Sequence, residues 1–350
     1  MLFAILTITK NPVLLYNYGI KLIKKEFSMK LDIMRELSLI GLIPVIKIEN
    51  PDDAVPLAKA LIDGGLPAAE ITFRTPSAAQ AIKNITTAFP EMLVGAGTVT
   101  TTEQVDAAIS AGSKFLVSPG LNPKVTSYSL SKGITMLPGC SNPSDIEAAM
   151  ELGLTTVKFF PAESAGGLKM LKAMSAPYGQ IKFMPTGGIN SENLLEYLKF
   201  NKVVACGGSF MVKDELIKEK RWEEITSLTR QAVKAMLGLE FLHIGINNED
   251  TSEAEISAEL FRAMFGLPLR ATSKSVFAGE EFEFMYGKGP GRCGHIGVRT
   301  NFLDRAMAYF NRLGFEFENS SITYDDKTGR AKFAYFKNEI SGFAVHIVEK

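Results

Sequence analysis

Short, uninterrupted apolar runs recur along the first two thirds of the chain, with amphipathic segments between them. An unbroken apolar run is typical of a parallel strand that is buried on both faces. The segments between the runs have helical periodicity. One example is residues 142–153, with Asn142 or Ser144 as a candidate N-cap and Gly153 at the end. The runs are IPVIKI (43–48), AAEITF (68–73), LVGAGTV (93–99), KFLVSPG (114–120), ITMLPGC (134–140), TVKFFPA (156–162), IKFMPTGG (181–188) and VVACGGS (203–209).

The spacing of these runs predicts the fold of residues 29–237. The strand–helix unit repeats every 20 to 25 residues or so, and there are eight runs. Eight such units favour an α/β fold of the (β/α)8 TIM-barrel type. The alternative is a doubly wound parallel sheet, which usually has fewer strands.

The remainder of the chain, residues 239–350, contains an internal repeat. LEFLHIGI (239–246) reappears as GRCGHIGV (291–298), and each copy precedes an amphipathic helix, at 254–266 and 302–314. Alternating strand-like runs follow each helix. We therefore expect a smaller α+β domain built from two βαβββ repeats. The runs are SKSVFAGEEFEFMY (273–286) in the first copy and SSITYD (320–325), GRAKFAYFK (329–337) and GFAVHIVEK (342–350) in the second.

The N-terminal residues 1–28 do not fit either pattern. Their apolar start is interrupted by Lys10, which leaves it too short to cross a membrane, and it lacks the basic start and small-residue cleavage site of a secretory signal. We interpret these residues as a leader outside the fold, upstream of a possible start at Met29. A membrane-touching amphipathic helix is the alternative.

Composition and charge exclude several classes of protein. The chain is 46% hydrophobic and 22% charged, as in ordinary globular proteins. Its 38 basic and 38 acidic residues balance, which argues against general binding to nucleic acid or to a membrane surface. Cys140, Cys206 and Cys293 are too few and too scattered for a disulfide framework and fit a reducing compartment. We expect a cytoplasmic protein.

Polar residues and glycines collect where the predicted strands end. A barrel brings the carboxyl ends of its strands together on one face, where active sites form. These residues therefore make one candidate site, although they are far apart in sequence. They are Lys47, Glu70, Arg74, Thr98, Pro119, Cys140, Lys158, Thr186 and Ser209.

Lys158 lies inside the apolar run V-K-F-F-P, which should be a buried strand. Lysine is among the residues least often buried without a partner. Burial disfavours the ammonium form, and a neutral amine can attack a ketone to give a Schiff base. The alternative is a strand-end lysine whose ammonium group reaches solvent.

Glu70 has a similarly apolar frame, AAEITFR, with Arg74 close by in the sequence. A carboxylate in such surroundings needs a partner. One interpretation makes Glu70 a general base facing Lys158, with Arg74 holding a substrate carboxylate. The other is a structural ion pair between Glu70 and Arg74. The spacing alone leaves both open.

The last two strands of the predicted barrel end in glycine pairs, T-G-G-I (186–189) and G-G-S-F (207–210). Barrel enzymes often bind phosphate on the loops after strands seven and eight, where glycine lets the backbone approach the anion. Two pairs at the two expected ends support a phosphate site. Gly95-Ala96-Gly97 lacks the third glycine of a dinucleotide-binding motif and is discounted.

Two longer stretches resemble a known family. GLPAAEITFR (65–74) and GLTTVKFFPAESAG (153–166) are similar to the signature stretches of the 2-keto-3-deoxy-6-phosphogluconate / 4-hydroxy-2-oxoglutarate aldolases. GAGTV (95–99), SPG (118–120), PTGGI (185–189) and GGSF (207–210) also resemble that family. The resemblance runs from about residue 30 to 237 and implies a Schiff-base aldolase.

The resemblance also implies roles for individual residues. Lys158 would form the Schiff base and Glu70 would move protons, without a metal or other cofactor. The residues that would bind the substrate, through its carboxylate, its body or its phosphate, are Arg74, Thr98, Pro119, Phe160, Thr186, Gly187, Gly188, Gly208 and Ser209. The family is typically trimeric, so we expect a homotrimer. The substrate would be a small 2-keto acid.

Other functions remain open at this point. A different phosphate-binding barrel, such as a sugar-phosphate epimerase, would use acid–base residues without an imine. A barrel could also serve as a non-catalytic binding scaffold. Within the aldolase interpretation, the sequence leaves open whether the aldehyde product is glyceraldehyde 3-phosphate or glyoxylate, and which C4 configuration the enzyme prefers.

The C-terminal repeats resemble the vicinal oxygen chelate (glyoxalase / bleomycin-resistance) fold. That fold takes metal ligands from the first and last strand of each repeat, which here implies His243, Glu283, His295 and His346. Such donors suit Zn²⁺, Ni²⁺, Fe²⁺ or Mn²⁺. His346 replaces the usual glutamate. The alternatives are ordinary hydrogen-bonded histidines with Glu283 facing solvent, and a sensing or assembly role instead of a second activity.

Overall fold

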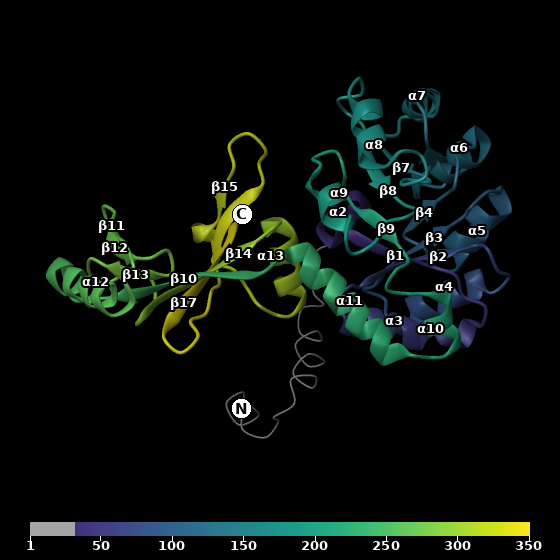
Figure 1. The fold of residues 1–350 in the computed structure, drawn as a ribbon. Helices are drawn as coiled ribbons and strands as arrows, with labels where there is room; N and C mark the ends of the chain where they lie inside the picture. The colour runs from purple at the N-terminus through teal and green to yellow at the C-terminus, as the bar shows by residue number, and fades with distance from the viewer. Residues whose placement is uncertain (1–31) are drawn as a thin grey trace. The chain divides into compact units, whose positions relative to one another are not determined.

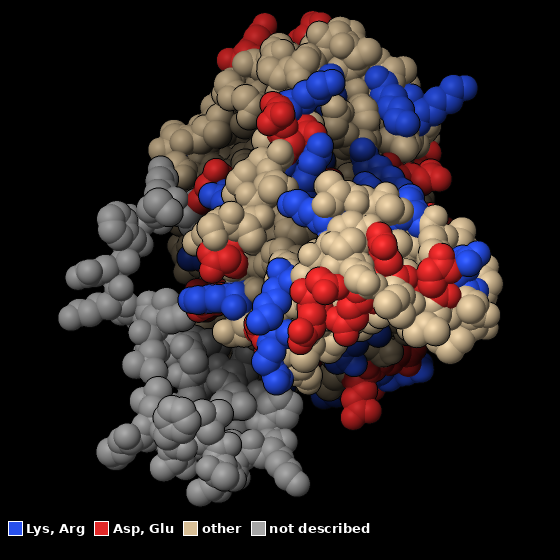
Figure 2. All heavy atoms as spheres, turned by 90° about the vertical axis from the view of Figure 1, so that its left-hand side faces the viewer, with Lys and Arg blue, Asp and Glu red and all other residues tan. Residues whose placement is uncertain are grey.

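The computed structural model describes residues 32–350, which form two compact units, residues 32–236 and residues 237–350. The predicted leader, residues 1–28, lies outside the described residues. No helix in residues 32–350 is long and apolar enough to cross a membrane. On the face shown in Figure 2, lysine and arginine side chains are interspersed with aspartate and glutamate.

The strands of the first unit form a closed parallel barrel. Hydrogen-bonded neighbours follow the orders β5-β4-β3-β2-β1-β9 and β6-β7-β8. Bridges Phe183↔Val203 and Thr186↔Gly207 join the last two strands, and Pro138 separates β5 from β6 within one predicted strand. The predicted TIM barrel is confirmed. The strands are β1 (Leu42–Ile46), β2 (Ala68–Thr72), β3 (Leu93–Gly97), β4 (Phe115–Val117), β5 (Thr135–Leu137), β6 (Gly139–Cys140), β7 (Thr156–Phe159), β8 (Lys182–Pro185) and β9 (Cys206–Gly208).

Helices surround these strands, as Figure 1 shows. The first turns of some of these helices, such as α5, α6 and α7, are capped by side chains. Asn142, the first of the two predicted candidates, accepts a hydrogen bond from the Asp145 amide, and helix α7 ends before Gly153, whose φ is 79°. The helices are α2 (Ile33–Ile40), the 3₁₀ turn η1 (Pro51–Asp53), α3 (Ala54–Asp63), α4 (Ala78–Ala88), α5 (Thr102–Ser110), α6 (Pro123–Ser131), α7 (Pro143–Glu151), α8 (Gly167–Ser175), α9 (Leu194–Lys199), α10 (Asp214–Lys218) and α11 (Trp222–Leu237).

The barrel interior is apolar, which is why its strands read as unbroken apolar runs. Every residue of β2, β3 and β4 is buried. Phe115 fills the space beside Gly95, where an added Cβ would lie 2.3 Å from the phenylalanine ring. Close packing of this kind leaves the strand ends fixed in position, which is what an active site on the barrel face requires.

The second unit contains two βαβββ repeats in one sheet, as predicted. The strand order is β11-β12-β13-β10-β14-β17-β16-β15, so the two copies meet where β10 pairs antiparallel with β14. Its elements are β10 (Glu240–Asn247), α12 (Thr251–Phe265), β11 (Leu269–Ala271), β12 (Ser275–Ala278), β13 (Phe282–Met285), β14 (Gly294–Thr300), α13 (Leu303–Arg312), the 3₁₀ turn η2 (Asn319–Ser321), β15 (Thr323–Tyr324), β16 (Ala331–Tyr335) and β17 (Phe343–Glu349).

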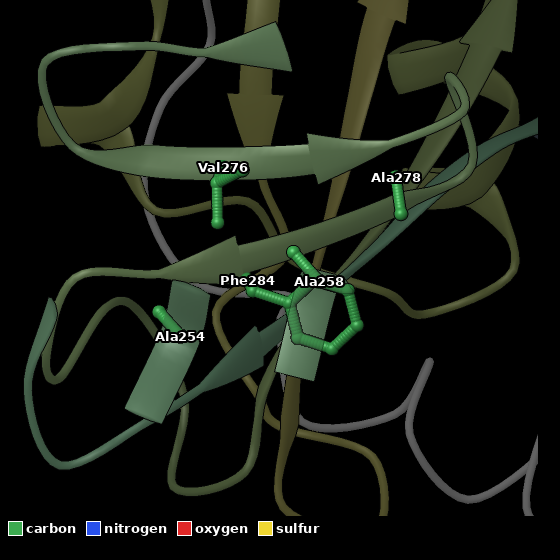
Figure 3. Packing of buried hydrophobic residues seen from close by; sticks show 5 residues of the cluster. All are labelled: Ala254, Ala258, Val276, Ala278 and Phe284. Atoms are coloured by element: carbon green, nitrogen blue, oxygen red, sulfur yellow. The ribbon is translucent and has the colours of Figure 1, made fainter. Parts of the chain in front are cut away.

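Each repeat has a hydrophobic core of its own. In the first copy, alanines of α12 pack on Val276, Ala278 and Phe284 of the sheet, as Figure 3 shows. In the second copy, Leu303 of α13 packs with Ile347 and the strand residues around it. Each helix therefore covers the sheet of its own repeat, and the opposite face of the sheet carries the polar cluster described below.

Candidate functional site

Lys158 and Glu70 form a buried pair at the centre of the barrel face. Lys158 lies on β7 and Glu70 on β2, and the Lys158 Nζ is 3.4 Å from Glu70 Oε1. Their side chains are 6% and 1% exposed. The ammonium group therefore does not reach solvent, so that alternative is wrong. Glu70 forms its ion pair with Lys158 and not with Arg74, so the predicted alternative of a structural Glu70–Arg74 pair is wrong.

The backbone around the pair leaves room for a substrate-facing carboxylate. Gly97 of β3 lies directly beside Glu70, and a Cβ there would be 2.2 Å from Oε1. Glu70 Oε2 and Thr186 Oγ1 are buried and have no hydrogen-bond partner among the described residues. Burying such groups without a partner is costly. These two oxygens are therefore available to a bound molecule.

Arg74 lies just beyond the end of β2 and is exposed. Its Nε donates to Thr72 Oγ1 at 3.1 Å, and Thr72 donates in turn to the Ile46 carbonyl at 2.8 Å. The Thr72 hydroxyl thus holds Arg74 through its Nε and leaves the two terminal nitrogens of the guanidinium group for a substrate. Sequence reasoning missed Thr72; its one signal is its place two residues before Arg74, on the same strand-end segment.

The other predicted substrate-binding residues lie on the loops that follow the strands. The Phe160 ring centre is 5.1 Å from Lys158 Nζ, so the ring forms one wall beside the amine. Thr98 follows β3 with a φ of 58°, a conformation rare outside glycine. Pro119 follows β4 and is exposed. Lys47, another residue at a predicted strand end, forms an ion pair with Glu49, with 2.6 Å between Nζ and Oε1.

The glycine loop after β8 has its carbonyl groups tied away from the loop. The Thr186 and Gly187 carbonyls accept from the Ala162 and Glu163 amides at 2.8 and 3.0 Å. The Gly188 carbonyl accepts from the Asn193 side chain at 3.0 Å. The parallel bridge Thr186↔Gly207 turns the Gly187 amide toward Gly207, whereas the Gly188 amide has no acceptor among residues 32–350. Unpaired amides of this kind form an anion-binding site.

The second predicted glycine pair lies on the neighbouring strand. Gly207 packs against Thr186, where a Cβ would be 2.4 Å from Oγ1, and its bridge to Thr186 joins the two loops. Gly208 ends β9 and is buried, and Ser209 follows it on the surface. The two glycine pairs are therefore adjacent in space, as the barrel topology requires.

A second cluster of polar groups lies on the sheet of the C-terminal unit. His243 Nε2 is 3.0 Å from His295 Nε2 and 3.3 Å from His346 Nε2. Glu283 Oε2 is 3.1 Å from His295 Nε2 and 3.6 Å from His243 Nε2. The donor atoms of the three histidines all lie within 4.8 Å of one another. The structure therefore brings together all four residues that the repeats predict, and Glu283 does not face solvent.

Glycines of the H-I-G tripeptides make room for the histidine rings. His243 pairs with Gly297 and His295 with Gly245 across the antiparallel strands. A Cβ on Gly245 would lie 2.0 Å from the His295 ring, and a Cβ on Gly297 would lie 2.9 Å from His346 and 3.2 Å from His243. Each copy thus supplies the space for a ring of the other copy.

The surroundings of the cluster set the protonation of its members. Burial, together with the neighbouring histidines, lowers the pKa of His346 to about 3. Burial also lowers the pKa of His243, with His295 adding to the effect. Burial raises the pKa of Glu283, but hydrogen bonds from His295 and Ser275 outweigh it and leave the pKa below its usual value. These lowered pKa values leave His243 and His346 as neutral imidazoles and Glu283 as a carboxylate at neutral pH, the forms that bind metals.

Sequence reasoning missed two kinds of neighbour here. Ser275 Oγ donates to Glu283 Oε1 at 2.6 Å and so holds the carboxylate in place. Aromatic rings flank the histidines. The ring centre of Phe277 is 6.0 Å from that of His243, and the ring centres of Phe333 and Tyr335 are 4.8 and 5.2 Å from that of His346. The alternation of strand residues was the one available signal for these positions.

The barrel unit has clear relatives. The family model of KDPG and KHG aldolase matches residues 32–228, more than half of the chain. The chain belongs to this family. A curated 2-dehydro-3-deoxy-phosphogluconate aldolase from Haemophilus influenzae is 46% identical over 57% of this chain and 95% of its own length. The KHG/KDPG aldolase of Escherichia coli K12 is 40% identical over 55% of this chain and 90% of its own.

Solved structures of the aldolase family agree with this assignment. A KDPG aldolase from Legionella pneumophila, with pyruvate captured as a covalent carbinolamine intermediate, has a TM-score of 0.56 and 40% identity; it covers 58% of this chain and 99% of its own. A Zymomonas mobilis 2-keto-3-deoxy-6-phosphogluconate aldolase with 3-phosphoglycerate has a TM-score of 0.54 and 39% identity, over 57% of this chain and 94% of its own. Both matches cover little more than half of this chain.

Proposed function

We propose that the barrel unit is a Schiff-base aldolase that cleaves 2-keto-3-deoxy-6-phosphogluconate to pyruvate and glyceraldehyde 3-phosphate. The observation that carries the proposal is the buried Lys158–Glu70 pair, in contact across the barrel and walled by Phe160. An amine and a carboxylate held this way supply a nucleophile and a proton carrier without bulk water. The curated relatives and the carbinolamine-trapped structure support the same chemistry.

We propose a role for each group in the cleavage. Neutral Lys158 adds to the C2 ketone, and Glu70 carries protons as the carbinolamine loses water to give an iminium. The iminium accepts the electron pair of the C3–C4 bond when the C4 hydroxyl loses its proton, which releases the aldehyde. Glu70 helps to protonate the resulting pyruvate enamine, and hydrolysis frees Lys158. Arg74, fixed by Thr72, holds the keto-acid carboxylate.

Borohydride reduction in the presence of pyruvate tests this mechanism. We expect one added mass at Lys158 and loss of activity, because reduction makes the imine permanent. Lys182→Met, at an exposed lysine of the neighbouring strand β8, is the matched control and should label like the wild type. An inactivated protein whose Lys158 carries no label would exclude the imine and favour an epimerase-type barrel. Absence of pyruvate release from the wild type would favour a binding scaffold.

We propose that the phosphorylated substrate is preferred over 4-hydroxy-2-oxoglutarate, which would yield pyruvate and glyoxylate. The support is the pair of glycine loops, since a phosphate would satisfy the free amide of Gly188. Specificity constants for the gluconate-series acid, its C4 epimer and the short acid test the preference. Phosphorylated acids that are no better than the short one would contradict it.

We further propose the homotrimer, which sedimentation equilibrium of the full chain tests.

We propose a divalent metal site in the C-terminal unit, formed by His243, Glu283, His295 and His346. The residues fit a metal: four donors converge, Ser275 holds the carboxylate, and the glycines opposite the rings are needed to accommodate them. The unit's βαβββ repeats support the likeness to the vicinal oxygen chelate fold. A bound divalent ion would supply a Lewis acid for vicinal oxygens of a ligand.

Metal analysis of protein purified without a histidine tag tests this site. We expect close to one equivalent in the wild type and its loss in His243→Ala. Glu249→Gln, which changes an exposed carboxylate just beyond β10, is the control and should keep the metal. Less than about a tenth of an equivalent in the wild type, unchanged in His243→Ala, would mean that there is no metal site.

A further inference from the structure

The loop after β7 packs directly against the glycine loop after β8. Gly188 has a φ of 82°, and a Cβ there would lie 2.5 Å from Glu163 Cγ, so the glycine backbone rests directly on the Glu163 side chain. The Glu163 amide donates to the Gly187 carbonyl at 3.0 Å. Glu163 thus contacts the Gly187–Gly188 loop through both its backbone and its side chain.

The Glu163 carboxylate is itself held by a buried tyrosine. Tyr197 of α9 is 1% exposed, and its hydroxyl donates to Glu163 Oε1. Burial, with this hydrogen bond adding to it, raises the pKa of Tyr197, so the phenol keeps its proton and remains a donor. Gly167 leaves space for the two groups, because a Cβ there would be 3.2 Å from Glu163 Oε1 and 3.5 Å from the Tyr197 hydroxyl.

We infer that Tyr197 and Glu163 are positioning residues for phosphate recognition, and that they set the preference for phosphorylated over unphosphorylated substrate. The inference rests on the aldolase proposed above. A free carboxylate beside the loop would repel a phosphate dianion and leave Gly188 unsupported. The Tyr197 hydroxyl fixes that carboxylate on one side of the glycines, while the loop carbonyls are tied back by Ala162, Glu163 and Asn193. The Gly188 amide then stays oriented for the anion.

Steady-state kinetics of Tyr197→Phe with two substrates test the inference. The change removes one oxygen and keeps the buried ring. We expect kcat/KM for 2-keto-3-deoxy-6-phosphogluconate to fall about tenfold, mainly through KM, the effect of losing one hydrogen bond to a charged group. The same constant for 4-hydroxy-2-oxoglutarate should change less than about twofold, because that acid has no phosphate. Glu163→Gln keeps an acceptor for the tyrosine and should retain the preference, whereas Glu163→Ala should lose it.

The chain provides a matched control. Tyr178 donates to Glu147 at 2.8 Å in a second tyrosine–glutamate pair of the same unit, and neither residue contacts the glycine loops. Tyr178→Phe should leave both specificity constants unchanged. Borohydride trapping with pyruvate, which carries no phosphate, should label Tyr197→Phe like the wild type and shows that the variant is folded.

The outcomes separate this inference from the function on which it rests. If Tyr197→Phe traps pyruvate normally but both specificity constants fall equally or neither falls, the positioning role is excluded and the aldolase stands. If Tyr197→Phe no longer traps pyruvate, the tyrosine is structural and the inference is also wrong. If the wild type forms no imine, the aldolase proposal fails, and the inference fails with it.

Discussion

At the scale of single residues, the barrel site depends on small side chains as much as on reactive ones. Glu70 can lie beside Lys158 because residue 97 has no side chain. Arg74 is oriented because Thr72 offers a hydroxyl to its Nε. Each of these neighbours gives a prediction that separates geometry from chemistry, because neither residue takes part in a bond-making step.

Gly97→Ala should reduce kcat by roughly a hundredfold. The new methyl group would lie 2.2 Å from Glu70 Oε1 and must displace the carboxylate, and misplacement of a catalytic group by about 1 Å can cost this much. Steady-state pyruvate release measures the effect. Gly179→Ala is the control, because an added Cβ meets nothing within 4 Å there. Unchanged kcat in Gly97→Ala would mean that the position of Glu70 is not critical.

Thr72→Val should raise KM for the keto-acid substrate about fivefold with little change in kcat. Valine keeps the shape but removes the acceptor for Arg74 Nε, a loss of about 1 kcal/mol in the binding of the carboxylate. Thr75→Val is the matched control, since the Thr75 hydroxyl donates to the Ile48 carbonyl at 2.5 Å and does not accept from the Arg74 guanidinium. Equal rises in KM for both variants would point to loosening of the loop rather than to Arg74.

The charged groups that meet in the barrel could be singled out from sequence, whereas the residues that support them could not. Lys158 and Glu70 are charged residues inside apolar runs, and this unusual placement can be seen from the sequence alone. Thr72 and Tyr197 are ordinary residues in ordinary surroundings. Their importance arises from what the fold places next to them, and Tyr197 is 34 residues away from Glu163 along the chain.

At the scale of elements, periodicity predicted the strands well but not their interruptions. Pro138 divides the run 134–140 into β5 and β6, because proline cannot donate to the strand ladder. The short strand β11, Leu269–Ala271, lies outside the strand-like run predicted at 273–286; its three residues pair antiparallel with β12 and are set by that neighbour rather than by their own sequence.

Helix α5 allows a test of local helix stabilisation. Thr101 Oγ1 accepts from the Gln104 amide, and the Gln104 side chain accepts from the Thr101 amide, which forms a capping box. Thr101→Ala and Gln104→Ala should each lower the free energy of unfolding of the barrel by about 1 kcal/mol. Urea unfolding followed by the fluorescence of Trp222, the sole tryptophan, measures this. The double variant should lose less than the sum, since the two bonds depend on each other; strict additivity would argue against a box.

Strands β10 and β14 allow a test of the proposed metal site. Gly245→Ala should weaken binding of the divalent metal at least tenfold, because the methyl group would lie 2.0 Å from the His295 ring and push it out of position. Competition with a metal-binding dye measures the affinity. Phe241→Ala, at an exposed position of the same strand, should bind metal like the wild type. Equal affinities of Gly245→Ala and the wild type would show that His295 is not a ligand.

At the scale of the whole molecule, the two sites belong to separate units. Lys158, Glu70 and the glycine loops lie within residues 32–236, and the histidine cluster lies within residues 237–350. From the sequence, the strand–helix spacing predicts a barrel at residues 29–237, and the internal repeat predicts a second domain at 239–350. The sequence could not predict whether the units influence each other, because that depends on contacts between surfaces rather than on patterns within each unit.

Chelation of the proposed metal should therefore leave the proposed aldolase reaction unchanged while it destabilises the C-terminal unit. Ligands that bind only the folded state stabilise it, so their removal lowers the melting temperature of that unit alone. Differential scanning calorimetry with and without chelator, paired with pyruvate-release assays on the same samples, measures both effects. Loss of cleavage on chelation, restored by added metal, would show that the barrel reaction depends on the ion.

The register of the two H-I-G tripeptides also bears on how the C-terminal unit could be divided. Each copy brings two donors and the gap into which a ring of the other copy fits. Neither copy supplies all four donors by itself. If the chain were cut in the segment that separates β13 from β14, metal binding would measure the reassembly of the two fragments. The full metal affinity would return only when the two pieces recombine in their native alignment.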